Sequence, residues 1–349
     1  MTLLSAIQNR VLLFDGAMST MLQQSGLLHS GECAELFNAT RPMDILDIHT
    51  AYLNAGADIM TANTFGCSPL RLSRFGLQER MEELMQSGVS LCREAVSGRD
   101  RAVFVAASIG PSGELYHSDP YMPQRMYESF FEQCAAAEAA GADALLIETM
   151  IDLREARLAL LAARAATSLP VLVSFTLEPD DNTYAGNPPE VLALCSARLG
   201  ASLCGVNCGL GPEELFGGYS RLTCASPLPT FAIPNAGLPA NGRYSMSPAE
   251  MSRHMEVYLH GGAAAIGGCC GATPAHISAL RTLLDGFHGN ARQAAPDTET
   301  ICSAAVRLPM SQLEPFDPRR LFGRSPVQAA DRRRAAAQLR QPLHIALSD

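Results

Sequence analysis

The feature that most constrains this sequence is a short apolar run that recurs eight times, each time ending in polar or glycine-rich residues and leading into a helical stretch. Continuous apolar character is typical of parallel strands buried on both faces, and the intervening segments are long enough for crossover helices. The runs cover residues 11–14, 58–61, 103–106, 144–147, 171–174, 203–206, 230–233 and 263–266. Residues 42–55 and 152–166 carry apolar side chains at helical spacing and are predicted to be two of the helices.

Eight strand-helix units within residues 1–289 predict a (β/α)8 barrel of the TIM type, with a doubly wound open sheet as the alternative. The barrel is favoured because residues able to do chemistry directly follow the strands, and barrel enzymes build their sites at the carboxyl ends of the strands. These residues are Asp15, Asn63, Thr64, Ser108, Glu148, Cys208, Asn235, Cys269 and Cys270. After residue 289 the pattern stops, so we expect residues 290–349 to form a linker and an irregular or partly helical tail of unknown role.

Charge and composition exclude several functional classes. A net charge of −9 argues against nucleic-acid binding, which needs a basic surface. All 26 basic residues are arginines, and the lack of lysine excludes Schiff-base chemistry and Walker-type phosphate binding. No apolar run reaches the roughly 18 residues of a membrane helix, and the first residues lack the pattern of a secretion signal. We therefore expect a cytoplasmic protein with no membrane partner, whose eleven cysteines are reduced.

Three of the cysteines suggest a metal centre. Cys208 lies between glycines at residues 205 and 209, and the adjacent pair Cys269 and Cys270 also has glycines on both sides. In a barrel these segments end the sixth and eighth strands, and flanking glycines allow the backbone angles that let adjacent cysteines bind one metal. Three thiolates leave the fourth position of a zinc ion open, as catalytic zinc sites do. The alternatives are small buried hydrophobic residues, or a redox-active disulfide between the adjacent pair.

A zinc site with three thiolate ligands suits a thiol substrate. Its negative charge makes it a poor activator of water, but a thiol that binds as fourth ligand loses its proton while its sulfur stays nucleophilic. Because a free thiol is only slightly ionised at neutral pH, the metal would supply the attacking species. The chemistry that this site predicts is alkyl transfer to a thiol.

A thiol substrate that is an amino acid also needs partners for its carboxylate and ammonium groups. The turn at Asp15, Gly16 and Ala17 offers backbone N–H groups ahead of a helix, and such turns bind carboxylates. Glu148 can pair with the ammonium group, and the segment that begins with Asn63 and Thr64 can line the pocket. The alternatives are helix capping by the aspartate and by the Asn-Thr segment, and a surface position for the glutamate.

An ordered set of segments resembles a known family. They are Asp15-Gly16-Ala17-Met18, Asn63-Thr64-Phe65-Gly66, Ser108-Ile109-Gly110-Pro111, Glu148-Thr149-Met150, Gly205-Val206-Asn207-Cys208, Pro234-Asn235-Ala236-Gly237-Leu238-Pro239 and Gly267-Gly268-Cys269-Cys270-Gly271-Ala272-Thr273-Pro274. Over about residues 11–284 the chain resembles the zinc-dependent homocysteine S-methyltransferases, and most closely the homocysteine-binding module of cobalamin-dependent methionine synthase. Each segment alone is weakly specific, whereas their ordered set is highly specific.

The resemblance implies a barrel with one zinc ion on Cys208, Cys269 and Cys270. It also implies that Asn235 is the oxygen ligand that fills the fourth zinc position until the substrate displaces it. The alternative for the asparagine is a simple turn residue.

The resemblance further implies that homocysteine is the incoming thiol and that methionine is the product. Asp15 and Glu148 would hold its amino group, while the amides of Gly16 and Ala17 and the side chain of Ser108 would orient the rest.

The resemblance leaves the methyl donor open. Methionine synthase continues into folate, cobalamin and reactivation modules, whereas this sequence ends at Asp349 after an unrelated segment. We therefore expect a methylcorrinoid to be supplied in trans by a separate protein or by methionine synthase modules, and residues 234–239 favour this branch. The alternatives are direct use of a small donor such as S-methylmethionine or betaine and, in another class, a noncatalytic zinc- or thiol-binding subunit.

Overall fold

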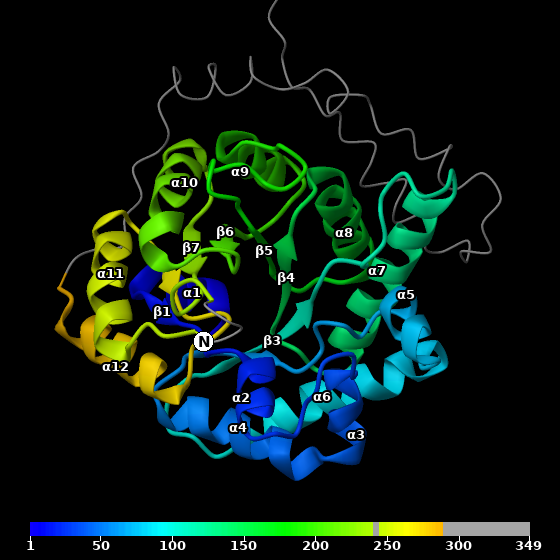
Figure 1. The fold of residues 1–349 in the computed structure, drawn as a ribbon, viewed down its shortest axis with the longest axis horizontal. Helices are drawn as coiled ribbons and strands as arrows, with labels where there is room; N and C mark the ends of the chain where they lie inside the picture. The colour runs from blue at the N-terminus through cyan, green and yellow to red at the C-terminus, as the bar shows by residue number, and fades with distance from the viewer. Residues whose placement is uncertain (240–243, 289–349) are drawn as a thin grey trace, which may run out of the picture.

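A computed structural model describes residues 1–239 and 244–288, and the predicted tail at residues 290–349 lies outside them. Eight parallel strands form a nearly closed barrel inside a ring of helices (Figure 1). The strands are β1 (Leu12–Leu13), β2 (Ile59–Ala62), β3 (Phe104–Ile109), β4 (Ala144–Met150), β5 (Val171–Phe175), β6 (Leu203–Asn207), β7 (Thr230–Ile233) and β8 (Ala265–Ile266). All eight predicted runs contain a strand, and their parallel order β1-β8-β7-β6-β5-β4-β3-β2 confirms the predicted barrel over the open sheet.

Helices follow every strand. They are α1 (Leu3–Asn9), α2 (Met18–Gln24), α3 (Phe37–Thr40), α4 (Pro42–Asn54), α5 (Pro69–Leu72), α6 (Met81–Val96), α7 (Met122–Ala139), α8 (Leu153–Ala166), α9 (Pro189–Arg198), α10 (Pro212–Ala225), α11 (Pro248–His260) and α12 (Pro274–Gly286), with short 3-10 turns at Ala34–Leu36, Ser73–Phe75 and Gln78–Arg80. The helices predicted at residues 42–55 and 152–166 are α4 and α8. Asp152 caps α8 by accepting a hydrogen bond from the Arg154 amide at 2.8 Å. In the described part of the chain no helix is both long and apolar enough to cross a membrane.

The strands are buried on both faces, which explains their continuous apolar sequences. In β4, Leu145 and Ile147 belong to the core between strands and helices, whereas Ala144 and Leu146 belong to the core inside the barrel. The alternation places residue 148 at the mouth of the barrel, on the inner face. Helix α1 contributes Leu3 and its neighbours to the inner core and closes the amino end of the barrel.

The barrel closes between β1 and β2 through few backbone contacts. Phe14 and Ile59 form a single β-bridge, and the Asp58 amide donates to the Leu13 carbonyl oxygen at 2.7 Å. The Asp58 carboxylate strengthens this junction because it also accepts a hydrogen bond from the Leu13 amide at 3.1 Å.

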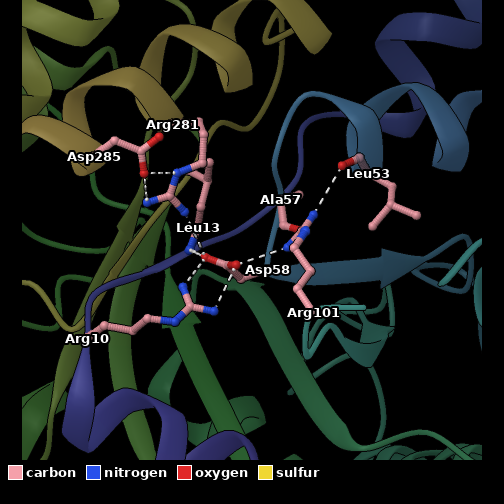
Figure 2. A network of polar contacts seen from close by, with 8 residues as sticks. All are labelled: Arg10, Leu13, Leu53, Ala57, Asp58, Arg101, Arg281 and Asp285. Carbon is pink, nitrogen blue, oxygen red and sulfur yellow. Dashed lines mark hydrogen bonds and ion pairs between the residues drawn. The ribbon is translucent and has the colours of Figure 1, made fainter. Parts of the chain in front are cut away.

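Three guanidinium groups surround the same carboxylate at the amino end of the barrel (Figure 2). Arg10 contacts Asp58 at 2.7 Å, Arg101 at 3.0 Å and Arg281 at 3.2 Å, while the Asp58 side chain is only 3% exposed. Arg101 also donates to the Leu53 and Ala57 carbonyl oxygens. The network joins segments that precede β1, β2 and β3 to α12, so it ties the first and last parts of the barrel together.

Candidate active site

A pocket opens at the carboxyl ends of the strands, on the loops where the sequence places the candidate residues. Nine predicted residues line it, namely Asp15, Gly16, Ala17, Asn63, Ser108, Glu148, Cys208, Cys269 and Cys270. Thr64 and Asn235, the other two, are buried beside the pocket and do not line it. The barrel therefore brings together residues from the carboxyl ends of six of its strands.

The three predicted cysteines converge in this pocket. The Sγ atoms of Cys208 and Cys270 are 3.7 Å apart, and all three sulfur atoms lie within 4.8 Å of one another. None of the three forms a disulfide. Within residues 1–239 and 244–288 no other group of three metal-binding side chains is this compact. Their arrangement provides one face of a tetrahedral metal site.

Backbone geometry makes this convergence possible. Cys208 has a φ of 59°, in the left-handed region that non-glycine residues rarely adopt, and Gly271 has a φ of 82°. The Cys269 amide donates to the Pro234 carbonyl oxygen at 2.8 Å, and the Ala236 amide donates to the Cys270 carbonyl oxygen at 2.9 Å. The loop after β7 thus fixes the backbone of the cysteine pair through two hydrogen bonds.

The thiols share their protons unequally. Hydrogen bonds from Cys208 and then Cys269 lower the pKa of the Cys270 thiol to about 3, and Tyr244 adds a further hydrogen bond. Hydrogen bonds with Cys208 and then Cys270 hold the pKa of the Cys269 thiol well above its ordinary value. A metal ion bound by all three cysteines has to displace the thiol protons.

The carboxyl groups of Asp15 and Glu148 line the same pocket as the thiols. Burial raises the pKa of Asp15 to about 7 against a lowering hydrogen bond from the Thr61 amide, which the Oδ2 atom accepts at 2.8 Å. Burial likewise raises the pKa of Glu148 to about 7, although the Ser108 hydroxyl donates to its Oε1 atom. No arginine pairs with either carboxyl group in the described part of the chain, so a cation that entered the pocket would find two acceptors.

Asn207 organises the Glu148 side of the pocket, a role that the sequence reading did not assign to it. Its Nδ2 atom donates to Glu148 Oε2 at 3.2 Å and to Thr149 Oγ1 at 2.8 Å. Its Oδ1 atom accepts from the Thr149 amide at 2.9 Å and from the Ser174 hydroxyl at 2.8 Å. Thr149 has a φ of 62°, and these bonds stabilise that strained backbone next to the carboxylate.

The predicted pocket residues Asn63 and Thr64 are held by neighbouring loops. Asn63 Nδ2 donates to the Ala34 carbonyl oxygen at 2.9 Å and to Asn38 Oδ1 at 2.8 Å. The Thr64 hydroxyl donates to the Ser108 carbonyl oxygen at 2.9 Å. Both side chains therefore brace the loop after β2, and their contact with a substrate stays a prediction.

Asn235 has an unsatisfied acceptor beside the thiols. The residue is 2% exposed, and its Oδ1 atom has no hydrogen-bond partner. Its amide donates to the Leu210 carbonyl oxygen, and the next residue, Ala236, is bonded to Cys270. A buried oxygen without a donor is costly unless it meets a cation or a donor, so its position fits the predicted role of oxygen ligand.

Comparison with known proteins identifies the family. The homocysteine S-methyltransferase family matches residues 12–284. The chain belongs to this family. The pocket that contains the three thiols and two carboxyl groups thus belongs to a homocysteine S-methyltransferase family member, and this membership favours an enzyme over a noncatalytic subunit.

Two curated relatives are much longer than this homocysteine S-methyltransferase family member. Methionine synthase of Mycobacterium tuberculosis is 30% identical over 332 residues, which are 89% of this chain and 27% of the relative. Methionine synthase of Mycobacterium leprae is 29% identical over the same share of this chain and 28% of its own length. The chain therefore spans about a quarter of these relatives.

The chain is also similar to a solved structure that is about as long as its barrel. The metallated form of the homocysteine methyltransferase MmuM from Escherichia coli has a TM-score of 0.68 and 25% sequence identity. The similarity covers 79% of this chain and 96% of that structure. The oxidised form of the same enzyme gives a TM-score of 0.67 and 26% identity.

Proposed function

We propose that this protein transfers a methyl group to the sulfur of homocysteine and forms methionine, with a zinc ion bound by Cys208, Cys269 and Cys270. The observation that carries the proposal is a single pocket that contains three free thiols within 4.8 Å of one another and two carboxyl groups without a cationic partner. The thiols match the sulfur end of an amino-acid thiol, and the carboxyl groups match its ammonium end.

The donor set suits zinc. Three thiolates with one open position are typical of a zinc site that accepts a substrate ligand, and the three thiols here lie within 4.8 Å of one another. The unpartnered Oδ1 of Asn235 offers a neutral fourth ligand. When bound there, zinc supplies the positive charge that removes the proton from a thiol at neutral pH.

The other residues bind and orient the substrate. Asp15 and Glu148 receive the ammonium group, and its positive charge favours their ionised forms over the protonated forms that burial favours. Ser108 and Asn207 fix the Glu148 carboxylate by hydrogen bonds. Holding the substrate at its amino end aims its sulfur at the incoming methyl group, and such positioning contributes a large part of the rate of a displacement reaction.

We propose a methylcorrinoid, carried by another protein or module, as the methyl donor. Support comes from the two methionine synthases, of which this chain matches about a quarter, and from the Pro234-to-Pro239 segment that resembles their branch. In this proposal the corrinoid approaches the open mouth of the barrel, where the thiols lie.

The test measures zinc and methionine in matched variants. Cys208→Ala, Cys269→Ala and Cys270→Ala should each lose bound zinc and methionine formation from homocysteine and methylcobalamin. The exposed Cys224 on α10 provides a control, Cys224→Ala, that should keep both. Full turnover by a zinc-free variant would contradict the proposal.

A second candidate, direct use of a small donor, has its own support. The similarity covers 96% of the Escherichia coli homocysteine methyltransferase structure, so that enzyme consists almost entirely of the part that matches this barrel. Assays of the zinc-loaded protein with homocysteine and S-methylmethionine or betaine separate the candidates. Turnover with a small donor and without any corrinoid would favour the second one.

A further inference from the structure

Tyr52 connects two loops of the pocket from outside the barrel. It lies in α4, is fully buried, and donates a hydrogen bond from its hydroxyl group to the Ala272 carbonyl oxygen at 2.8 Å. The Ala17 carbonyl oxygen lies 3.2 Å from the same hydroxyl group. A single phenol therefore contacts the loop after β1 and the loop after β8.

These two loops carry the two halves of the proposed chemistry. The first contains Asp15, which faces the ammonium group, and ends at Ala17. The second contains Cys269 and Cys270 and continues into Ala272. Their relative position sets the distance between the carboxyl group and the thiols.

The fit around Tyr52 is close. A Cβ atom placed on Gly16 would lie 2.5 Å from the Tyr52 ring, so the turn after Asp15 can approach this closely only with glycine. The ring thus fixes the turn by packing, and the hydroxyl group fixes it by hydrogen bonding.

Other links between the loops are weaker or more exposed. The Gly268 amide donates to the Asp15 carbonyl oxygen, and the Ala17 amide to the Ala272 carbonyl oxygen, both at 3.4 Å. The Gly271 amide donates to the Thr20 hydroxyl at 3.0 Å. The bond from Tyr52 to Ala272, at 2.8 Å, is shorter than these three bonds, and its donor lies within helix α4.

We propose that Tyr52 is a positioning residue that holds the substrate-binding turn at a fixed distance from the metal-binding cysteines. The inference rests on the proposed function for its effect on zinc and homocysteine. Its structural part, the restraint of two loops by one hydroxyl group, is tested independently.

Tyr52→Phe removes only the hydroxyl group, and Tyr219→Phe is the matched control. Tyr219 is also fully buried, and its hydroxyl group lies 3.1 Å from that of Thr230 at the amino end of β7, far along the barrel from the pocket. Both variants remove one buried phenol hydroxyl group with its hydrogen bonds, so they should lose similar stability.

Hydrogen exchange on the metal-free protein provides the first measurement. In Tyr52→Phe, peptides that contain the amides of Ala17, Gly268 and Gly271 should exchange about fivefold faster or more, the factor expected for one lost hydrogen bond. In Tyr219→Phe, these peptides should exchange as in the wild type. Equal exchange in the two variants would overturn the proposal, and so would failure of Tyr52→Phe to fold where Tyr219→Phe folds.

Binding provides the second measurement. Tyr52→Phe should release zinc to a chelator several-fold faster, and the zinc-loaded variant should bind homocysteine about fivefold more weakly by calorimetry. A merely structural role would lower the unfolding midpoint of both variants and leave both binding readouts unchanged. If the wild-type protein bound neither zinc nor homocysteine, the proposed function would fail, whereas the exchange comparison would still decide the role of Tyr52.

Discussion

The two ends of the barrel differ in whether their carboxylates have arginine partners. At the amino end, Asp58 is surrounded by Arg10, Arg101 and Arg281 and accepts the Leu13 amide (Figure 2). At the carboxyl end, Asp15 is equally buried and Glu148 is partly buried, but their hydrogen bonds come only from neutral groups.

The difference indicates that one carboxylate stabilises the fold and the others are available to a ligand. A carboxylate with several cationic partners holds chain segments together, whereas one without a cationic partner can still form an ion pair with a bound ligand. The amino end is thus complete in the free protein, whereas in the proposed function an ammonium group and a metal ion complete the carboxyl end.

The largest effect is expected from Asp58→Asn. The substitution leaves three guanidinium groups without their shared partner, and we expect a loss of about 3 to 5 kcal/mol in the free energy of unfolding. Urea denaturation measures it, and Asp285→Asn, at the exposed outer partner of Arg281, should lose less than about 0.5 kcal/mol. Similar losses in both variants would break the comparison, as would weaker homocysteine binding by folded Asp58→Asn.

The reverse outcome is expected from Glu148→Gln. Removing a carboxyl group that has no cationic partner should cost no stability, whereas homocysteine binding should weaken by about 10- to 100-fold because a hydrogen bond to a charged group is lost. Calorimetry on the zinc-loaded protein checks the affinity. Unchanged affinity would show that the ammonium group binds elsewhere.

The pH dependence of stability sharpens the comparison. The folded pKa values of Asp15 and Glu148 are about 7, above the ordinary 3.8 and 4.5, so the folded state keeps protons that the unfolded state releases. The contribution of each group is therefore fully present below its ordinary pKa and is lost as the pH rises to about 7, by up to about 1.4 kcal/mol per pH unit.

Asp15→Asn tests this sign. The variant should gain stability relative to the wild type as the pH rises from 4 to 7, in urea titrations of the metal-free protein. A stability difference that stays constant across this range would show that the carboxyl group titrates normally.

The smallest effect is expected from Ser108→Ala. The Ser108 hydroxyl donates to Glu148 and lowers its pKa against the effect of burial, so its loss should raise that pKa further. Homocysteine affinity at pH 7 should fall about fivefold. The affinity increases as Glu148 ionises, so the pH at which this increase occurs should be higher in the variant. The control is Ser196→Ala, whose hydroxyl bonds within α9; an equal shift in both variants would contradict the role of Ser108.

The fold could be predicted because its signal is local. Strands buried on both faces must be continuously apolar, and each of the eight runs therefore marks a strand within a few residues. The strand ends differ where backbone pairing decides them: β3 extends to Ile109, three residues beyond the predicted run, because it continues to pair with β4.

The site could be predicted only where a residue follows a strand directly. Asn207 could have been found from the alternation of inward residues along β6, because Leu203 faces the inside of the barrel and residue 207 is four positions later. Tyr52 and the arginines around Asp58 gave no such signal, because they lie on helices and loops, and their partners are up to 223 residues away in the sequence. Such contacts exist only once the barrel has closed.

The pairing of β1 with β8 has a consequence for synthesis of the protein. Asp15 leaves the ribosome some 250 residues before Cys269 and Cys270. A nascent chain that lacks the last strand has one of the three thiols and no complete pocket. In the proposed function, metal uptake by the three thiols therefore reports that translation has passed the eighth strand and that the ring has closed.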